Sequence, residues 1–83
     1  MNPGDTIIIR TVTYHYTGRI ESIDEQWIHL RDAAWIADSG RWAQALAAGV
    51  LDEVEPYPDH CWIAVDSIAD VSPWLHPLPR EVR

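Results

Sequence analysis

The residues that could do chemistry are few and lie far apart in the chain. Histidine occurs four times and cysteine once, at His15, His29, His60, His76 and Cys61. No two histidines have the i, i+4 spacing of a helical metal pair, and the chain has no phosphate-loop, paired-cysteine or metalloprotease motif. On a strand, the adjacent side chains of His60 and Cys61 would point to opposite faces, which does not suit a nucleophile and its base. We therefore predict no catalytic residue, no metal ligand and no cofactor, and we expect Cys61 to be a buried structural residue.

Three aspartates could in principle act as paired carboxylates. Each of them, however, lies at an expected strand end or turn, where aspartate is common for structural reasons. These residues are Asp24, Asp32 and Asp66. The sequence therefore favours a protein that is not an enzyme.

One group of residues has the composition of a binding surface. Trp27, His29 and Arg31 alternate along an expected strand, so their side chains would share one face. Aromatic rings can stack on nucleobases, and a guanidinium can contact phosphate. An open alternative is that this face packs against a neighbouring subunit or against the helix of the same chain.

Composition restricts the classes of partner. The chain has 83 residues, of which 47% are hydrophobic and five are tryptophan. This is a heavy apolar load for one small domain, and oligomerisation is a common remedy for a small core. Thirteen acids stand against six basic residues, all of them arginine, which gives a formal net charge of −7. Strong generic binding of nucleic acid needs clustered positive charge and is not expected.

The first half of the chain reads as strands. Thr6–Tyr16 is rich in β-branched and aromatic residues, which predicts one long bent strand that ends at a Thr17–Gly18 connection. Gly18–Ile23 and Trp27–Arg31 follow as two further strands, and Asp24–Gln26 supplies the polar turn between them.

A short helix is expected at about residues 39–49. Its residues are good helix formers, and either Asp38 or Ser39 could cap its N-terminus. Gly49 stands where a C-terminal glycine cap belongs. The helix is too short to be stable alone, so it should pack on the strands through Trp42 and Leu46.

The second half of the chain contains more strands and ends in a proline-rich segment. Leu51–Glu55 could form a brief edge strand, and the sequence predicts strands at Cys61–Val65 and Ile68–Val71. Residues 73–83 contain three prolines and should form an extended tail, for which a loosely held terminus is the default interpretation.

These expectations describe a mainly β fold, a five-stranded and strongly bent antiparallel barrel of the SH3-like or Sm-like kind. The barrel would span residues 1–72, with a helical insertion at 33–60. Two stretches of the sequence resemble the two signatures of the Sm-like family, and most closely its bacterial RNA-chaperone branch. They are Gly18-x-Ile20-x-Ser22-Ile23-Asp24 with Trp27-Ile28-His29-Leu30, and Ile63-Ala64-Val65-Asp66-Ser67-Ile68-x-x-Val71-x-Pro73.

The resemblance implies a homo-oligomeric ring, by analogy a hexamer, in which the fourth strand of one subunit pairs with the fifth strand of the next. The interface would then contain Cys61, Trp62, Ile63, Ala64, Val65, Ile68, Ala69, Asp70 and Val71. The Lys-His pair of the bacterial branch is absent, with Val65 and Asp66 in its place, so the family's RNA pocket is not implied.

Two functional hypotheses follow. The first is a self-assembling ring that acts as a scaffold or makes weak, selective contact with short RNA. The alternative is a monomeric or dimeric acidic SH3-like barrel that binds or inhibits a basic protein partner. The sequence has neither a signal-peptide pattern nor an apolar run of about 18 residues, so we expect a cytoplasmic protein without a membrane partner.

Overall fold

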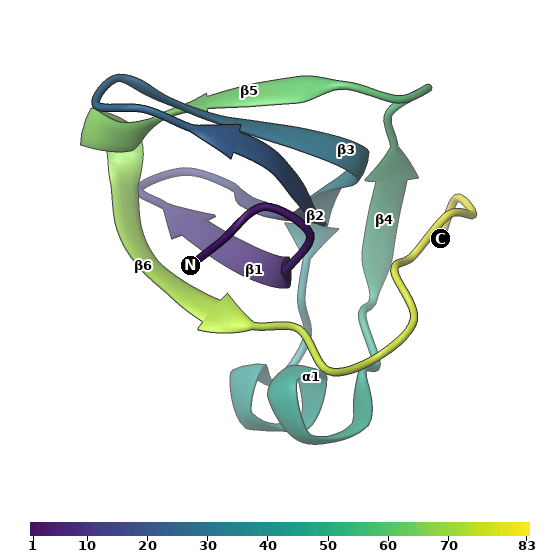
Figure 1. Ribbon diagram of the computed structural model, residues 1–83. Helices are drawn as coiled ribbons and strands as arrows, with labels where there is room; N and C mark the ends of the chain where they lie inside the picture. The colour runs from purple at the N-terminus through teal and green to yellow at the C-terminus, as the bar shows by residue number, and fades with distance from the viewer.

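The computed structural model describes residues 1–83 and is built mainly from antiparallel strands (Figure 1). The elements in chain order are β1 (Thr6–Thr11), β2 (His15–Ile23), β3 (Trp27–Asp38), α1 (Trp42–Ala48), β4 (Glu53–Pro56), β5 (Cys61–Ala64), the short helix η1 (Val65–Ser67) and β6 (Ile68–Pro73). The predicted fold class is confirmed. The chain forms a strongly bent antiparallel sheet with one short inserted α-helix, but the sheet has six strands instead of the predicted five and the barrel is not closed.

Strand β3 organises the sheet, because its twelve residues pair with three other strands. One edge pairs with β2. Along the other edge, Trp27–Leu30 pairs with β5 and Ala34–Asp38 pairs with β4. Between these two partners Asp32 adopts a positive φ of 51°, which marks an irregularity in the strand. The third strand therefore continues beyond the predicted end at Arg31 as far as Asp38.

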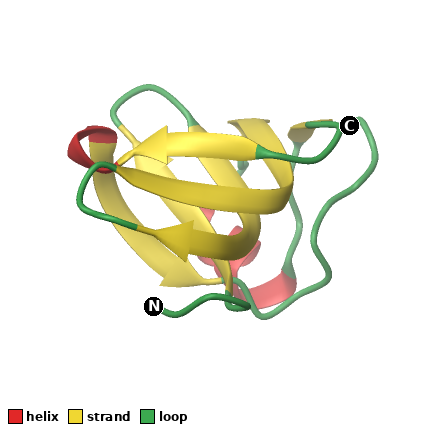
Figure 2. Cartoon of the chain, turned by 45° about the horizontal axis from the view of Figure 1, so that its top comes forward, coloured by secondary structure: helices red, strands yellow, loops and turns green.

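The remaining pairings leave the barrel open on one side. β1 pairs with β2 and with β6, so the path through the sheet is β4-β3-β2-β1-β6, with β5 attached to β3. β5 and β6 are joined through η1 but do not pair with each other. Figure 1 shows the two strands diverging from η1, and Figure 2 shows the strands curving around a common interior.

Three consecutive isoleucines of β1 are buried on two different faces. Ile7 and Ile9 belong to the core inside the curved sheet, which we call the inner core. Its other members are Ile20, Ile28, Leu30, Ala33 and Ile63. Ile8 points the other way, into a second core formed with Ala34, Ile36, Ala45, Leu51, Val54 and Trp74. A run of apolar residues without alternation is the pattern of a strand that is covered on both faces.

The first hairpin differs from the prediction, because the long strand Thr6–Tyr16 is broken by a tight turn at residues 12–14. The Thr11 amide and hydroxyl both donate to the carbonyl of Tyr14, at 2.8 and 2.7 Å. The Thr11 hydroxyl also accepts from the Tyr14 amide at 3.0 Å. A threonine side chain thus closes a turn that has no glycine, asparagine or proline, and Thr17–Gly18 lies within β2 instead of forming a connection.

The second hairpin agrees with the prediction. The Asp24 carboxylate accepts hydrogen bonds from the backbone amides of Gln26 and Trp27, at 2.8 and 2.9 Å. These two bonds stabilise the ionised form and lower the pKa of Asp24. Ile23, the last residue of β2, is 38% exposed next to this turn.

Helix α1 forms within the predicted range, but its N-terminal cap is different. Arg41 is the N-cap residue and makes no side-chain capping bond, whereas Asp38 accepts from the Gly40 amide in the preceding turn. The prediction of a cap at Asp38 or Ser39 was therefore wrong. Gly49 ends the helix in the left-handed conformation with φ of 72°, as its position suggested.

The packing of α1 also corrects an expectation. Trp42 and Leu46 are only half-buried and pack at the margin of the second core. The fully buried residue of the helix is Ala45, because a small side chain lets the short helix lie close to the sheet.

The C-terminal segment is extended, but it is not loose. Trp74 is 1% exposed and belongs to the second core. The Arg80 guanidinium donates to the carbonyls of Ala33 and Tyr57, at 2.8 and 3.0 Å. Arg83 exchanges two backbone hydrogen bonds with Val54 and so covers the outer edge of β4. The default interpretation of a loosely held terminus was wrong. The buried indole of Trp74, the side chain of Arg80 and the backbone of Arg83 hold the segment in place.

No helix in the structure has the length and apolar character needed to cross a membrane.

Candidate functional site

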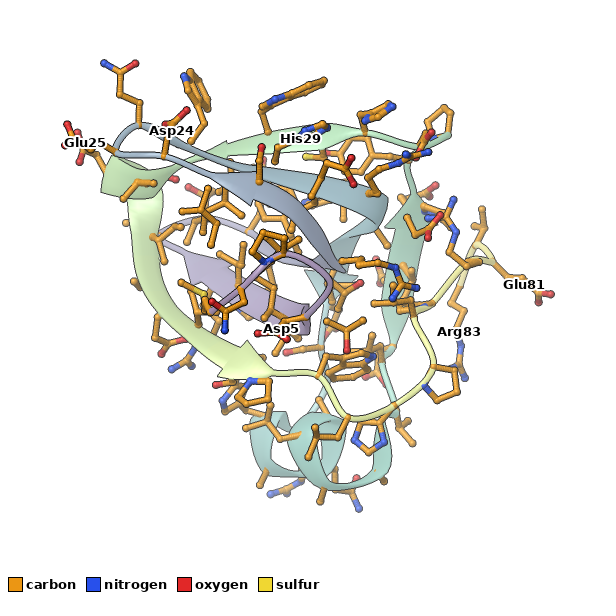
Figure 3. The ribbon with its side chains drawn as sticks, in the orientation of Figure 1. Asp5, Asp24, Glu25, His29, Glu81 and Arg83 are labelled. Carbon is orange, nitrogen blue, oxygen red and sulfur yellow. The ribbon has the colours of Figure 1, made fainter.

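The pairing of β5 with the first part of β3 creates a surface of aromatic and charged side chains on the outside of the sheet. In this register Ile28 lies opposite Ile63 and both are buried, while His29 lies opposite Trp62 on the other face. Figure 3 shows His29 on the side of this layer that faces away from the interior, with Asp24 and Glu25 at the turn at its end.

The outward side chains form what we call the outer strip, defined as Trp27, His29, Arg31, Asp59, His60 and Trp62. The structure places the three predicted binding residues of β3 on this one face, as the alternation indicated. Trp27 is 45% exposed and Trp62 is 55% exposed. Two large apolar rings are thus presented to solvent side by side with polar groups that can fix a ligand's orientation.

Three rings of the outer strip stack on one another. The imidazole of His29 lies over the indole of Trp62 with a centroid distance of 4.2 Å and an interplanar angle of 8°. His60 stacks beside them, 4.9 Å from His29 and 5.6 Å from Trp62. Such stacks restrict the rotation of exposed rings, so the strip has a defined shape.

A chain of polar contacts runs along the same strip. Arg31 donates two hydrogen bonds to the Asp59 carboxylate, at 3.2 Å from Nε and 3.0 Å from Nη2. These bonds hold the pKa of Asp59 below its ordinary value. Asp59 Oδ2 lies 3.3 Å from Nε2 of His60, and Nδ1 of His60 lies 2.7 Å from Nε2 of His29. With Asp59 ionised, the arrangement favours a proton on Nε2 of His60 and leaves Nδ1 as an acceptor for His29.

Sequence reasoning found only half of this surface. Trp27, His29 and Arg31 could be identified because they alternate along one strand. Asp59 and His60 were missed, and Trp62 was predicted only as a subunit-interface residue, because their place beside β3 depends on the pairing of two strands separated by the helical insertion. The only signal in the sequence was the alternation of His60 and Trp62 with Cys61 and Ile63 along β5.

Cys61 lies on the opposite face of β5 from His60, so the two do not form a nucleophilic pair. The thiol is half-buried against the inner core and near Tyr57. Burial raises the pKa of the Cys61 thiol, and burial also raises the pKa of Tyr57 to about 12. A thiol with a raised pKa is poorly reactive, which suits a structural role.

The three aspartates considered as paired carboxylates occupy separate structural elements. Asp24 closes the β2–β3 turn, Asp32 is 3.8 Å from the Arg19 guanidinium at the irregularity of β3, and Asp66 is in η1. No group of three or more His, Cys, Asp or Glu side chains is placed to hold a metal ion.

The predicted subunit-interface residues lie on β5 and β6, the two strands that flank the opening of the barrel, except for Val65, which is the first residue of η1. The Val65 amide donates to the carbonyl of Gln26. In the register of this pair, the backbone amides of Cys61 and Ile63 are therefore directed toward β3. By the same alternation, Trp62 and Ala64 direct their amides to the open edge. After β6, the Trp74 amide donates to the carbonyl of Thr6. By alternation, the backbone amides of Asp70 and Ser72 are directed toward β1, and the amide of Val71 is directed toward the open edge.

A cleft of about 490 Å³ lies beside the open edge of β6, between this strand and the N-terminal segment. It is lined equally by apolar and polar residues, namely Met1, Asp5, Thr6, Ile7, Val71, Ser72, Pro73 and Leu75. The charge of Asp70 does little to prevent another strand from pairing with this edge, because its carboxylate is bonded to Arg10 of β1.

No protein-family model, no curated protein and no solved structure matches the chain.

Proposed function

We propose that the protein is a cytoplasmic self-assembling module whose subunits join head to tail, with β5 of one subunit paired to β6 of the next. One observation carries this proposal. Each of these strands is bonded along one edge only, β5 to β3 and β6 to β1, and the barrel is open between them. A head-to-tail interface satisfies both edges in every subunit and gives a finite ring if the rotation closes. The resemblance to the Sm-like family favours six subunits.

The open edges give the proposal its energetic basis. The backbone amides of Trp62, Ala64 and Val71 lack a strand partner within the chain and are available for pairing. An unpaired, apolar strand edge is an aggregation hazard unless it is covered, shortened or charged. The edge of β4 is covered by Arg83, whereas no segment of the chain pairs with the edges of β5 and β6. Pairing with another subunit would cover them.

The work of the assembly would be to present several copies of the outer strip. In each copy Trp27 and Trp62 are available for stacking, as in proteins that bind single-stranded RNA. The guanidinium of Arg31 is already bonded to Asp59, and the net charge of −7 opposes phosphate at long range. We therefore propose a scaffold that makes weak and selective contact with short RNA.

The experiment compares two substitutions at Ala64. Its φ of −65° is the value that proline imposes, and its amide faces the open edge. Ala64→Pro therefore removes one donor of the interface without opposing the fold, while Ala64→Val keeps the donor and serves as the matched control. Light scattering after size exclusion should show a multimer for the wild type and Ala64→Val, and a smaller particle for Ala64→Pro.

A wild-type protein that remains monomeric at high micromolar concentration would overturn the ring. That result would favour the alternative function, an acidic SH3-like barrel that binds or inhibits a basic protein. Circular dichroism of each variant verifies that the strand content is retained, so that a change of mass can be assigned to the interface.

A further inference from the structure

We propose that His29 and His60 form a two-histidine site for a divalent transition-metal ion such as Ni²⁺, Zn²⁺ or Cu²⁺. The inference rests on the geometry of the outer strip within one chain and does not depend on self-assembly. Nε2 of His29 and Nδ1 of His60 approach to 2.7 Å, although the two residues are 31 positions apart in the sequence. The two rings thus bring nitrogen atoms to a single point on the surface.

The spacing is close to that of a chelating pair. Two nitrogen ligands at about 2.0–2.1 Å from a metal lie about 2.9 Å apart at the right angle preferred by Ni²⁺ and Cu²⁺, and about 3.4 Å apart at the tetrahedral angle preferred by Zn²⁺. The observed separation of 2.7 Å needs to open least for Ni²⁺ and Cu²⁺. Both side chains are partly exposed to solvent, so the rings can turn by the amount that a shared ion requires. The ion would take the place of the proton that lies between the two nitrogens. His29 would remain a neutral imidazole by carrying its proton on Nδ1 instead of Nε2, an exchange that proceeds through water and releases no net proton.

His60 is oriented for this role by its second nitrogen. Nε2 of His60 lies 3.3 Å from Asp59 Oδ2, and Asp59 is fixed by two hydrogen bonds from Arg31. A carboxylate on the far nitrogen of a histidine is the usual outer partner of a metal ligand, because it fixes the tautomer and makes the near nitrogen more basic. Asp59 is therefore a positioning residue, and the lone pair of Nδ1 is directed toward His29.

His29 is oriented by a different contact. Its ring lies almost parallel to the indole of Trp62 at 4.2 Å, which limits its rotation. The same stack places an exposed fluorophore next to the proposed ion. Imidazole nitrogen prefers the later transition metals, whereas Mg²⁺ and Ca²⁺ prefer oxygen ligands. Two protein ligands leave the remaining positions of the ion to water.

Isothermal titration calorimetry of the full chain with NiCl₂ tests the proposal, with MgCl₂ as the negative control. The wild type should bind one Ni²⁺ per chain, and binding should quench part of the tryptophan fluorescence. His29→Gln and His60→Gln should each weaken binding at least about tenfold, since each removes one of two ligands. His15→Gln, a histidine outside the strip, should leave the affinity unchanged.

Asp59 has a separate test, because a purely structural role would not predict its effect. Asp59→Asn should weaken Ni²⁺ binding by about tenfold or more while leaving the thermal midpoint near that of the wild type. Asp59→Glu should restore part of the affinity. The proposal is overturned if the wild type shows no binding at millimolar Ni²⁺, or if His29→Gln and His60→Gln both bind Ni²⁺ as tightly as the wild type.

Discussion

Gly18 of β2 lies directly against Leu30 of β3. A Cβ atom added at Gly18 would meet the Cβ and Cδ1 atoms of Leu30 at 3.0 Å. Leu30 is fully buried in the inner core, and its Cβ is fixed by the backbone, so it cannot move aside. Gly18 is therefore required by close packing between two strands, and not by an unusual backbone conformation.

We predict that Gly18→Ala lowers the free energy of unfolding by about 1–3 kcal/mol, as overpacking of a core does. Urea unfolding followed by tryptophan fluorescence measures the change. Ser22→Ala, an exposed position of the same strand, should change the value by no more than about 0.5 kcal/mol. Equal stability of Gly18→Ala and the wild type would mean that the two strands can separate at no cost.

The docked C-terminal segment predicts opposite results at two adjacent residues. Trp74 is 1% exposed and Leu75 is 85% exposed. Trp74→Ala should cost about 3–5 kcal/mol, because it leaves a large cavity in the second core. Leu75→Ala should stay within about 0.5 kcal/mol of the wild type. Thermal and urea unfolding of the two variants make the comparison, and similar losses in both would contradict the docking of Trp74.

The pair formed by Arg10 and Asp70 predicts a specific dependence on pH. Arg10 donates to both carboxylate oxygens and lowers the pKa of Asp70 in the folded state. The folded state then binds fewer protons than the unfolded state. The stability that the pair contributes is present above the ordinary aspartate pKa of about 3.9 and is lost as the pH falls through the lower folded value.

Asp70→Asn should therefore be less stable than the wild type at pH 7, and the difference should shrink as the pH falls through the folded pKa. Urea unfolding at a series of pH values measures this convergence. Arg10→Gln should give the same pattern, and the double variant should add little to either single change, since both remove one interaction. A difference that stays constant with pH would exclude the ion pair as its cause.

The outer strip predicts selective but weak contact with RNA. At physiological salt, unrelated RNA oligonucleotides should show no submicromolar binding by fluorescence anisotropy, because the net charge of −7 repels phosphate. Any sequence that does bind should lose its affinity in Trp27→Ala and keep it in Val12→Ala, an exposed residue outside the strip. Submicromolar binding of unrelated sequences would overturn this prediction.

Features fixed by local chemistry were predictable from the sequence. Asp24 in a polar turn between two apolar strands, and Gly49 after the last helical residue, both have their expected roles. The Val12–Tyr14 turn was not predictable from the usual turn residues, because a threonine hydroxyl closes it. The prediction of the N-terminal cap of α1 failed for a related reason, since the Asp38 side chain accepts from the Gly40 amide in the preceding turn instead of from an amide of the helix.

Features that depend on strand register were only half predictable. Alternation along β3 identifies Trp27 and His29 as neighbours on one face. It does not show that β5 returns with Trp62 opposite His29, since a shift of one residue would place Cys61 there instead. The buried position of Trp74 was hidden for another reason. Its flanking prolines are typical of an exposed segment, and the second core that receives it is formed by residues from four separate elements and one loop.

The burial of Ile7, Ile8 and Ile9 on two faces has a consequence for how the chain avoids mispairing. In most strands a slip of one residue exposes the apolar side chains, and this penalty enforces the correct alignment. If β1 slipped by one residue, it would still bury isoleucine on both faces. The burial of apolar side chains therefore discriminates only weakly between the correct register and a shifted one. The alignment must come from the two ends of the strand. At one end Arg10 binds Asp70, and at the other the Thr6 hydroxyl donates to the Trp74 carbonyl at 2.7 Å. These polar contacts at the two ends of β1 fix its register against the neighbouring strand.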